Sequence, residues 1–166
     1  MSDIDSGKIS IGDIEEAHLD SIAEISKLCF SNMYEFDWYE NAGNMLKLFR
    51  QGRVIVRVIK IGEKAAGFCN LRSWPCGGWI DLIAISPEYQ NKGLGSLLLE
   101  DIKEKAKSTG YWKISLIVSE REEKVISFYK RNGFIIVGEM LDEIKRGVNG
   151  ILMSCIVDYE LHPNKD

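Results

Sequence analysis

A short glycine-containing segment, Gln90 to Gly95, holds the residues best suited to chemistry in this chain. An apolar run of strand length, Leu82 to Ile85, precedes it and leucines at helical spacing follow it, which predicts a strand that turns directly into a helix. The first N–H groups of a helix have no intrahelical acceptor, and the positive end of the helix dipole lies behind them, so they suit a phosphate. Gly93 and Gly95 carry no Cβ that would keep a phosphate from the backbone. The segment therefore predicts a phosphate site.

Two common phosphate motifs do not fit this segment. A dinucleotide fingerprint needs a third glycine three residues after Gly95, where the chain has Leu98. A P-loop needs a lysine between its last glycine and a serine or threonine, whereas Ser96 follows Gly95 directly. The remaining alternative to a phosphate site is a glycine-bearing turn between a strand and a helix that binds no ligand.

The composition is that of an ordinary globular protein. The chain has 166 residues, of which 45% are hydrophobic and 28% charged, and its net charge is −4. This length suits one domain with a full core, and the charge argues against a nucleic-acid surface. No apolar run approaches the roughly 20 residues of a membrane-spanning helix, and the first residues lack the basic and apolar regions of a signal peptide. We therefore expect a cytoplasmic protein with no membrane or nucleic-acid partner.

Neither the cysteines nor the histidines suggest a metal centre or a nucleophilic triad. The 4 cysteines are widely spaced without a Cys-x-x-Cys pair, so no zinc site or disulfide framework is predicted. The 2 histidines are His18, which we expect on a helix surface, and His162, which lies in a polar C-terminal stretch. A Ser/His/Asp or Cys/His mechanism therefore has little support.

Consecutive strands are predicted before the phosphate site, which excludes the strict strand–helix alternation of a doubly wound fold. Asp101 and Lys105 are expected on the solvated face of the following helix, and Gly110 is expected to end it. The pattern predicts one domain over residues 1–166, with loose ends at 1–7 and 160–166. The expected strands are 8–11, 53–61, 65–72, 79–85, 112–118, 134–137 and 151–159, and the expected helices are about 14–29, 94–108 and 124–131, with a longer turn over 73–78 and a charged loop over 142–149.

The stretch 32–41 is dense in aromatic and acidic residues and has two interpretations. One is a helix start that packs its aromatic side chains onto the core. The other is a wall of a substrate pocket, where Glu35 or Asp37 attracts a cationic amine and an aromatic side chain such as Tyr34 supplies a cation–π contact.

The pattern Gln90-x-x-Gly93-x-Gly95, with the strand and Pro87 before it and the leucine-rich helix after it, resembles the acyl-CoA site of the GNAT superfamily of N-acetyltransferases. The segment from Phe128-Tyr129 to Gly133-Phe134 is similar to a second signature of that family. The resemblance covers nearly the whole chain. It implies a mixed α/β (α+β) fold with a mostly antiparallel sheet of six or seven strands, about four flanking helices, and a splay at the central strands that admits pantetheine.

The same resemblance implies how acetyl-CoA binds as a co-substrate, with no metal. The loop amides hold the CoA pyrophosphate, and backbone N–H groups around Ile83 to Ile85 stabilise the tetrahedral intermediate. The Tyr129 hydroxyl is the candidate acid for the leaving sulfur; the alternative is a tyrosine packed under the last strands. Glu122 lies closest to the place of the family's CoA-facing asparagine. The implied cofactor-binding residues are Ile83, Ala84, Ile85, Gln90, Asn91, Lys92, Gly93, Leu94, Gly95, Ser96, Glu122 and Tyr129.

The usual general bases of the family are missing from this chain. Trp79 occupies the place of a glutamate or histidine on the central strand, and Ile117 replaces a glutamate on the next strand. Asp81 lies two residues after Trp79 and shares its face. Asp81 is therefore either a proton relay acting through water or a buried aspartate paired to the preceding hairpin.

Two functions are compatible with these residues. The first is an N-acetyltransferase in which a primary amine of a small molecule or peptide attacks acetyl-CoA directly in a ternary complex, with Tyr129 and Asp81 as catalytic residues. The second is a non-catalytic acyl-CoA-binding or regulatory domain that has lost its base. The sequence does not identify the amine, although its acidic residues favour a cationic acceptor, and it is compatible with a homodimer. The expected substrate-binding residues are Tyr34, Glu35, Asp37 and Trp79.

Overall fold

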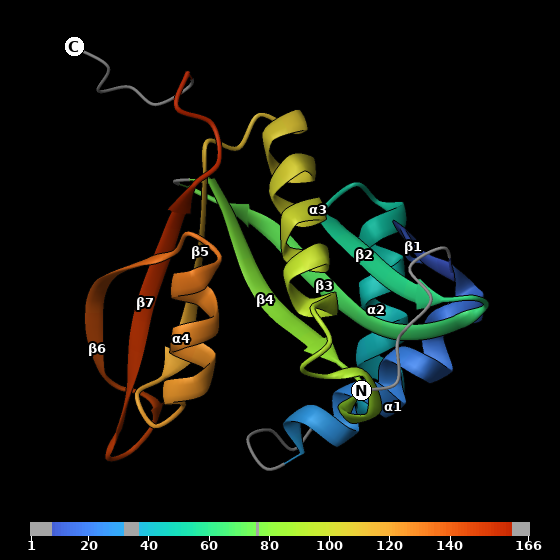
Figure 1. Ribbon diagram of the computed structural model, residues 1–166, viewed down its shortest axis with the longest axis horizontal. Helices are drawn as coiled ribbons and strands as arrows, with labels where there is room; N and C mark the ends of the chain where they lie inside the picture. The colour runs from blue at the N-terminus through green and yellow to red at the C-terminus, as the bar shows by residue number, and fades with distance from the viewer. Residues whose placement is uncertain (1–7, 32–36, 76, 161–166) are drawn as a thin grey trace. The chain divides into compact units, whose positions relative to one another are not determined.

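The computed structural model describes residues 8–31, 37–75 and 77–160. Within them, strands form a 7-stranded sheet in the order β1-β2-β3-β4-β5-β7-β6, accompanied by four α-helices (Figure 1). The predicted mixed fold is confirmed, because β4 pairs with β5 in parallel whereas β1–β2, β2–β3, β5–β7 and β6–β7 are antiparallel. The strands are β1 (Ile9–Asp13), β2 (Val54–Ile61), β3 (Lys64–Trp74), β4 (Gly77–Ile85), β5 (Lys113–Ser119), β6 (Ile135–Lys145) and β7 (Val148–Ile156). The α-helices are α1 (Leu19–Phe30), α2 (Trp38–Arg50), α3 (Leu94–Ser108) and α4 (Glu123–Arg131), and two short 3-10 helices are η2 (Glu16–His18) and η3 (Pro87–Tyr89).

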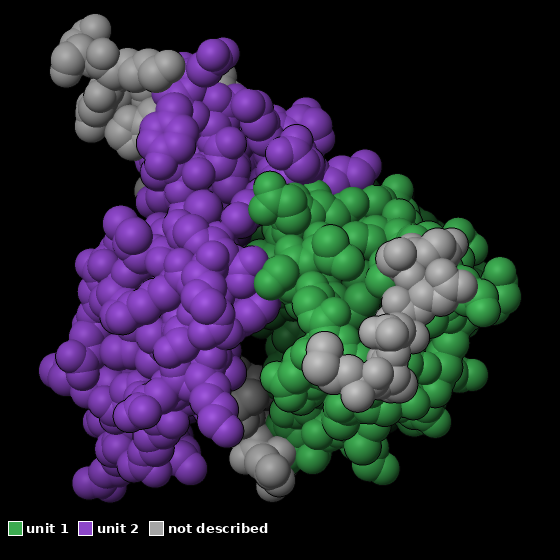
Figure 2. Space-filling model, viewed as in Figure 1, with its two compact units in different colours: residues 1–72, 81–102 green, residues 73–80, 103–166 purple. Residues whose placement is uncertain are grey.

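The chain divides into two compact units (Figure 2). Unit 1 comprises the described residues up to Arg72 together with Asp81–Ile102, and unit 2 comprises Ser73–Ile80 together with the described residues from Lys103 onward. Unit 1 thus contains α1, α2 and the start of α3, whereas unit 2 contains α4 and the last three strands.

The core of unit 1 forms between two amphipathic helices, α1 and α2, and the strands that they cover. Their apolar residues recur every three or four positions, which places them on one face of each helix. A helix with such a stripe is stable when it packs on the apolar face of a sheet. The buried cluster comprises Ile14, Ile22, Ala23, Ile25, Trp38, Ala42, Met45, Leu46, Val56, Val58, Ala65, Phe68 and Ala84.

Helix α3 begins and ends where the sequence predicts. Its buried residues Leu94, Leu98, Leu99, Ile102 and Ala106 follow the helical period. At its end, the Gly110 N–H donates to the Lys107 carbonyl and the Tyr111 N–H to the Ala106 carbonyl. Gly110 has φ 89°, the left-handed geometry that this helix termination requires.

The β4–β5 ladder in unit 2 is short. Among the described residues it joins Gly78 to Ile114 and Trp79 to Ser115. Gly77 precedes the ladder with φ 127°, and a Cβ built on it would lie 2.2 Å from the Lys113 carbonyl oxygen, so only glycine fits there. A ladder of this length is what the predicted splay of the central strands requires.

Two predicted loops are strands in the structure. The prediction of a longer turn over 73–78 is wrong, because β3 extends to Trp74 and β4 starts at Gly77. The prediction of a charged loop over 142–149 is also wrong, because β6 continues to Lys145 and β7 begins at Val148. An edge strand with solvated side chains tolerates charge on both faces, and Gly147, at φ 78°, closes the hairpin while its N–H donates to Asp142 Oδ1 at 2.8 Å.

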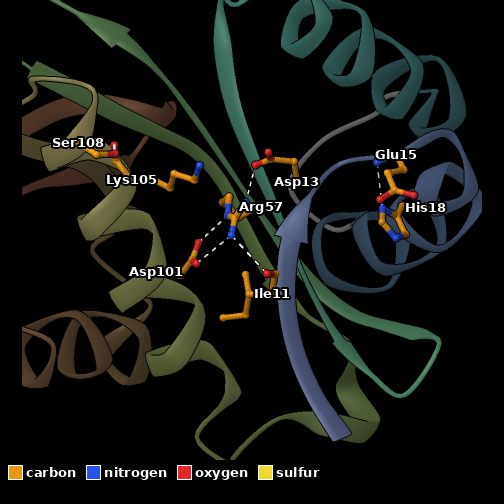
Figure 3. A network of polar contacts seen from close by, with 8 residues as sticks. All are labelled: Ile11, Asp13, Glu15, His18, Arg57, Asp101, Lys105 and Ser108. Atoms are coloured by element: carbon orange, nitrogen blue, oxygen red, sulfur yellow. Dashed lines mark hydrogen bonds and ion pairs between the residues drawn. The ribbon is translucent and has the colours of Figure 1, made fainter.

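His18 is buried rather than on a helix surface, with 8% of its area exposed. Its Nδ1 accepts a hydrogen bond from the Glu15 N–H at 3.0 Å and so serves the start of η2 (Figure 3). Burial lowers the pKa of His18, although the nearby Glu15 carboxylate opposes this effect. The neutral imidazole is therefore the form that the fold favours.

Arg57 brings a positive charge into the interior of unit 1. It lies in β2 with 8% of its area exposed, and its guanidinium donates to Asp101 of α3 at 2.6 and 3.0 Å and to Asp13 of β1 (Figure 3). The hydrogen bond to Asp101 is the main cause that raises the pKa of Arg57, so its charge is secure. Asp101 is therefore not a solvated partner of Lys105 as predicted; it anchors α3 to the sheet.

Arg57→Met should destabilise the fold markedly, because it retains most of the side-chain volume but leaves Asp101 and Asp13 without their cation. Because the Asp101 and Asp13 side chains are 23% and 47% exposed, we expect a loss of about 2 kcal/mol in free energy of unfolding, less than for a fully buried pair. Arg50→Met removes an exposed ion pair with Glu16 and should cost less than about 1 kcal/mol. Urea denaturation of both variants measures the difference, and equal losses would contradict a structural role for Arg57.

Candidate functional site

The segment between β4 and α3 is held by its own side chains. Ser86-Pro87 ends the strand, because proline has no N–H for a ladder. Beyond η3, the Gln90 side chain reaches back and donates from Nε2 to the Ile85 carbonyl at 2.9 Å. The Lys92 Nζ donates to the Glu88 carbonyl at 3.0 Å. The first part of the predicted phosphate loop is thus tied to the end of β4 by Gln90 and to η3 by Lys92.

The start of α3 has the geometry that the sequence predicts for an anion site. Asn91 and Gly93 have φ 59° and 83°, and the Gly93 carbonyl accepts the bonds from Ser96 and Leu97 N–H that begin the helix. The N–H groups at and just after such a cap have no intrahelical acceptor. A Cβ built on Gly93 would find nothing within 4 Å, so this side of the loop is open. The loop therefore offers helix-end donors beside an open space.

Two ammonium groups lie close to this loop. Lys64 Nζ is 5.5 Å and Lys92 Nζ 5.7 Å from the centre of the Tyr89 ring, one turn before Gly93. Lys64 also pairs with the Glu88 carboxylate at 2.6 Å. The Glu88 carboxylate offsets the charge of Lys64, whereas the Lys92 ammonium adds a positive charge beside the helix end, in the direction that favours an anion.

The end of β4 lies against the loop as predicted. Ala84 is buried, and Ile83 and Ile85 are half-buried. The Ile85 carbonyl accepts from Gln90 and, at 3.5 Å, from the thiol of Cys29 in α1. The structure thus brings Ile83–Ile85 together with Gln90, although it leaves their roles toward a ligand as predictions.

Asp81 is paired to the preceding hairpin, which is one of its two predicted states. Arg72 Nε donates to Asp81 Oδ1 at 2.7 Å, and about a third of each side chain is exposed, so the pair is not buried. Burial nevertheless raises the pKa of the Asp81 carboxyl, and Arg72 lowers it in part. A carboxylate with a raised pKa is a better proton acceptor near neutral pH. The relay itself stays a prediction.

Arg72 is the residue of this site that the sequence analysis missed. It lies on β3, nine residues before Asp81, in the strand that precedes β4. The available signal was a pair of opposite charges, one on each of the consecutive predicted strands 65–72 and 79–85.

Trp79 belongs to an aromatic pair in unit 2. Its ring centre lies 4.9 Å from that of Trp74, with the planes inclined by 36°. Trp74 is 41% exposed and Trp79 is half-buried, so the pair presents part of its indole surface to solvent.

Tyr129 is packed among aromatic side chains of unit 2. It is 5% exposed and meets Phe128 and Phe134 edge to face at 5.2 and 5.4 Å between ring centres. This packing fits the alternative interpretation of a core tyrosine, and its role as an acid stays a prediction. Glu122 is the exposed N-cap residue of α4, where its side chain makes no cap hydrogen bond.

The predicted substrate segment is described only from Asp37 onward; Tyr34 and Glu35 lie outside the described residues. Asp37 Oδ1 accepts from the N–H groups of Tyr39 and Glu40, both at 3.0 Å, which caps α2. Trp38 is buried, with its ring 6.1 Å from that of Phe30. In the described part, the interpretation of this stretch as a helix start packed on the core is confirmed.

Among residues 8–31, 37–75 and 77–160, no three His, Cys, Asp or Glu side chains gather in a group that could hold a metal ion. Over the same residues, none of the helices has the length and apolar character that crossing a membrane requires.

Residues 19–134 match the model of the acetyltransferase (GNAT) family. The chain is 44% identical over 84 residues to the tRNA(Met) cytidine acetyltransferase TmcA 2 of Saccharolobus solfataricus, a match that covers 50% of this chain and 10% of that protein. It is 32% identical over 81 residues to the spermidine N(1)-acetyltransferase of Escherichia coli K12, covering 47% of this chain and 44% of that enzyme. The match thus spans less than half the length of either curated relative.

A likeness in fold extends over nearly the whole chain. The crystal structure of an aminoglycoside 6′-N-acetyltransferase complexed with coenzyme A superposes with a TM-score of 0.79. The match covers 95% of this chain and 99% of that chain at 14% identity, a level that concerns the fold alone.

Replacing Arg72 should raise the pKa of Asp81 further, because the guanidinium is what lowers it against the effect of burial. In Arg72→Gln, the carbon resonance of the Asp81 carboxyl should therefore titrate at higher pH than in the unmodified protein. Arg50→Gln, which removes a cation paired with Glu16 instead, should leave this titration unchanged. A midpoint that does not move in Arg72→Gln would show that the pair does not form in solution.

Proposed function

The chain belongs to the acetyltransferase (GNAT) family, and from this premise we propose that it transfers an acetyl group from acetyl-CoA to a primary amine of a small molecule or peptide. The observation that carries the proposal is the loop before α3, where left-handed Gly93 leaves open space beside helix-end N–H groups. That arrangement fits the pyrophosphate of CoA, which needs several donors and close approach to the backbone.

The residues proposed to hold the pyrophosphate are the loop and first-turn residues. Their amides donate to phosphate oxygens, and the helix dipole and the Lys92 ammonium add favourable charge. Ile83 to Ile85 offer an extended backbone for pantetheine, and Glu122 is proposed to contact CoA near the start of α4. The loop residues in question are Gln90, Asn91, Lys92, Gly93, Leu94, Gly95 and Ser96.

The reaction needs one bond to form and one to break. The amine nitrogen attacks the thioester carbonyl carbon, the new C–N bond forms, and the C–S bond breaks with the electron pair leaving on sulfur. The backbone N–H groups around Ile83 to Ile85 are proposed to stabilise the oxyanion between these events. The Tyr129 hydroxyl is proposed to give its proton to the departing thiolate. The tyrosinate is then reprotonated by the proton that the attacking nitrogen loses once the C–N bond has formed, a different proton from the one that the ammonium group gives up before attack.

The proton of the amine requires an acceptor, since only the neutral amine attacks. A lysine-like amine has a pKa of about 10.4 and an α-amine one of about 8, so the former needs more help. Asp81 is proposed to take this proton through water. Its pairing with Arg72 at 2.7 Å orients the carboxylate, and its raised pKa strengthens it as a base.

A cationic amine is the acceptor class that we propose. The partly exposed Trp74–Trp79 pair can bind a cation on its indole faces, and Asp81 supplies a negative charge two residues from Trp79. Tyr34, Glu35 and Asp37 are further residues that we propose to contact the acceptor. The polyamine named for the E. coli relative, spermidine, is therefore the first acceptor to test. We further propose a cytoplasmic location, where the thiols of Cys29 and Cys69 stay reduced.

Gly93→Ala should weaken acetyl-CoA binding by about tenfold or more, the equivalent of one lost hydrogen bond to a charged group. The added methyl enters the open side of the loop and strains a backbone at φ 83°. Gly110→Ala is the matched control, because φ there is 89° and its Cβ site is equally open. Calorimetry with acetyl-CoA should show the loss only in the first variant; equal affinities in both variants would contradict the loop assignment.

We expect the protein to release CoA from acetyl-CoA with only some of a panel of amines. The panel compares spermidine with lysine peptides, N-terminal peptides and aminoglycosides.

With the best acceptor, Tyr129→Phe should lower kcat about 100-fold at unchanged acetyl-CoA affinity, as loss of a general acid does. Tyr159→Phe, at a 67% exposed position, is the control and should behave as wild type. Binding without turnover of any amine would favour the non-catalytic function, and a fully active Tyr129→Phe would remove Tyr129 from the mechanism.

A further inference from the structure

Three consecutive apolar residues lie exposed at the start of β6. Ile135, Ile136 and Val137, here called the β6 triplet, are 66%, 47% and 50% exposed. Successive residues of a strand point to opposite faces of the sheet. Their joint exposure therefore means that neither face of β6 is covered at this point.

The β6 triplet also lies at an open edge. β6 is the last strand in the sheet order, and Figure 1 shows it outermost in unit 2. Its inner edge pairs with β7, where Ile135 is opposite Ser154 and Ile136 opposite Met153, and a register shift follows at Val137. No strand of the described chain pairs with the outer edge. An exposed apolar edge strand is a template for pairing with another strand.

Charges flank the β6 triplet in a fixed order. Lys130 and Arg131, both exposed, end α4 before it, whereas Glu139 and Asp142, also exposed, follow it on β6. The chain thus runs basic, apolar, acidic. Two copies of such a segment attract each other when they run antiparallel, because the basic end of each meets the acidic end of the other. In parallel they would place like charges together.

We propose that β6 pairs antiparallel with β6 of a second copy of this chain, about a twofold axis through Ile136. The two triplets then cover each other, and Ile136 of one copy faces Ile136 of its partner. In this register Glu139 lies opposite Gly133 of the second copy, next to the end of α4 that carries Arg131 of that copy. Such an interface is isologous and closes at two subunits. A foreign strand would need the same basic, apolar, acidic order to pair antiparallel in this way, whereas a second copy supplies that order by symmetry.

The oligomeric state of the full chain tests this assignment. Sedimentation velocity over a concentration series should show a dimer, and Ile136→Glu should raise its dissociation constant about 100-fold or more, because it buries two like charges on the axis. Leu28→Glu is the matched control: Leu28 is 65% exposed on α1, outside this surface, and the dimer should persist. Thermal melting followed by circular dichroism should show that both variants are folded.

A charge exchange distinguishes this interface from other ways of pairing. Arg131→Glu and Glu139→Arg should each weaken the dimer about tenfold, and the double variant should recover most of the affinity, because the contact between copies is restored with its signs reversed. An Ile136→Cys variant should form a disulfide between copies under mild oxidation. A monomeric wild-type chain, a dimer unaffected by Ile136→Glu, or single exchanges without effect would each overturn the proposal.

Discussion

The buried guanidinium of Arg57 is the constraint on which unit 1 depends. A charge with 8% exposure is tolerated because carboxylates from β1 and α3 meet it, and the same contacts join those elements to β2. Asp101 lies two turns into α3, and that helix begins at the glycine loop. Since the direction of the helix-end N–H groups follows the helix axis, the ion pair that anchors α3 also fixes where the loop's donors point.

The loop itself leaves donors unused within the fold. Left-handed Gly93 starts the helix without a side chain above it, and the preceding residues are tied back to β4 by Gln90 and to η3 by Lys92. Backbone N–H groups without acceptors are unfavourable unless water or a ligand meets them. An anion that takes these bonds relieves that condition without moving the backbone, which is why a preformed loop suits a phosphate better than a flexible one.

Features set by local sequence were predictable, and features set by distant partners were not. The bounds of α3 follow from its apolar period and from Gly110, and the loop follows from two glycines between a strand and a helix. The burial of His18, the pairing of Arg57 and the strand character of 142–145 all depend on residues elsewhere in the chain. In the site, the loop was predictable for the same reason, whereas the Arg72 partner of Asp81 required the hairpin register.

Trp79 and Ile117 occupy the places of the family's usual general bases, and the positive charge of the proposed acceptor offers a reason why Asp81 could serve instead. Arg72 holds Asp81 as an oriented carboxylate and weakens it as a base, while burial acts in the opposite direction on its pKa. A carboxylate balanced in this way attracts an ammonium group and can share its proton through water without first giving up its own charge. In the proposed mechanism, the positive charge of the acceptor draws it to Asp81. The same charge that makes the amine unreactive in water would then guide it to the group proposed to remove its proton.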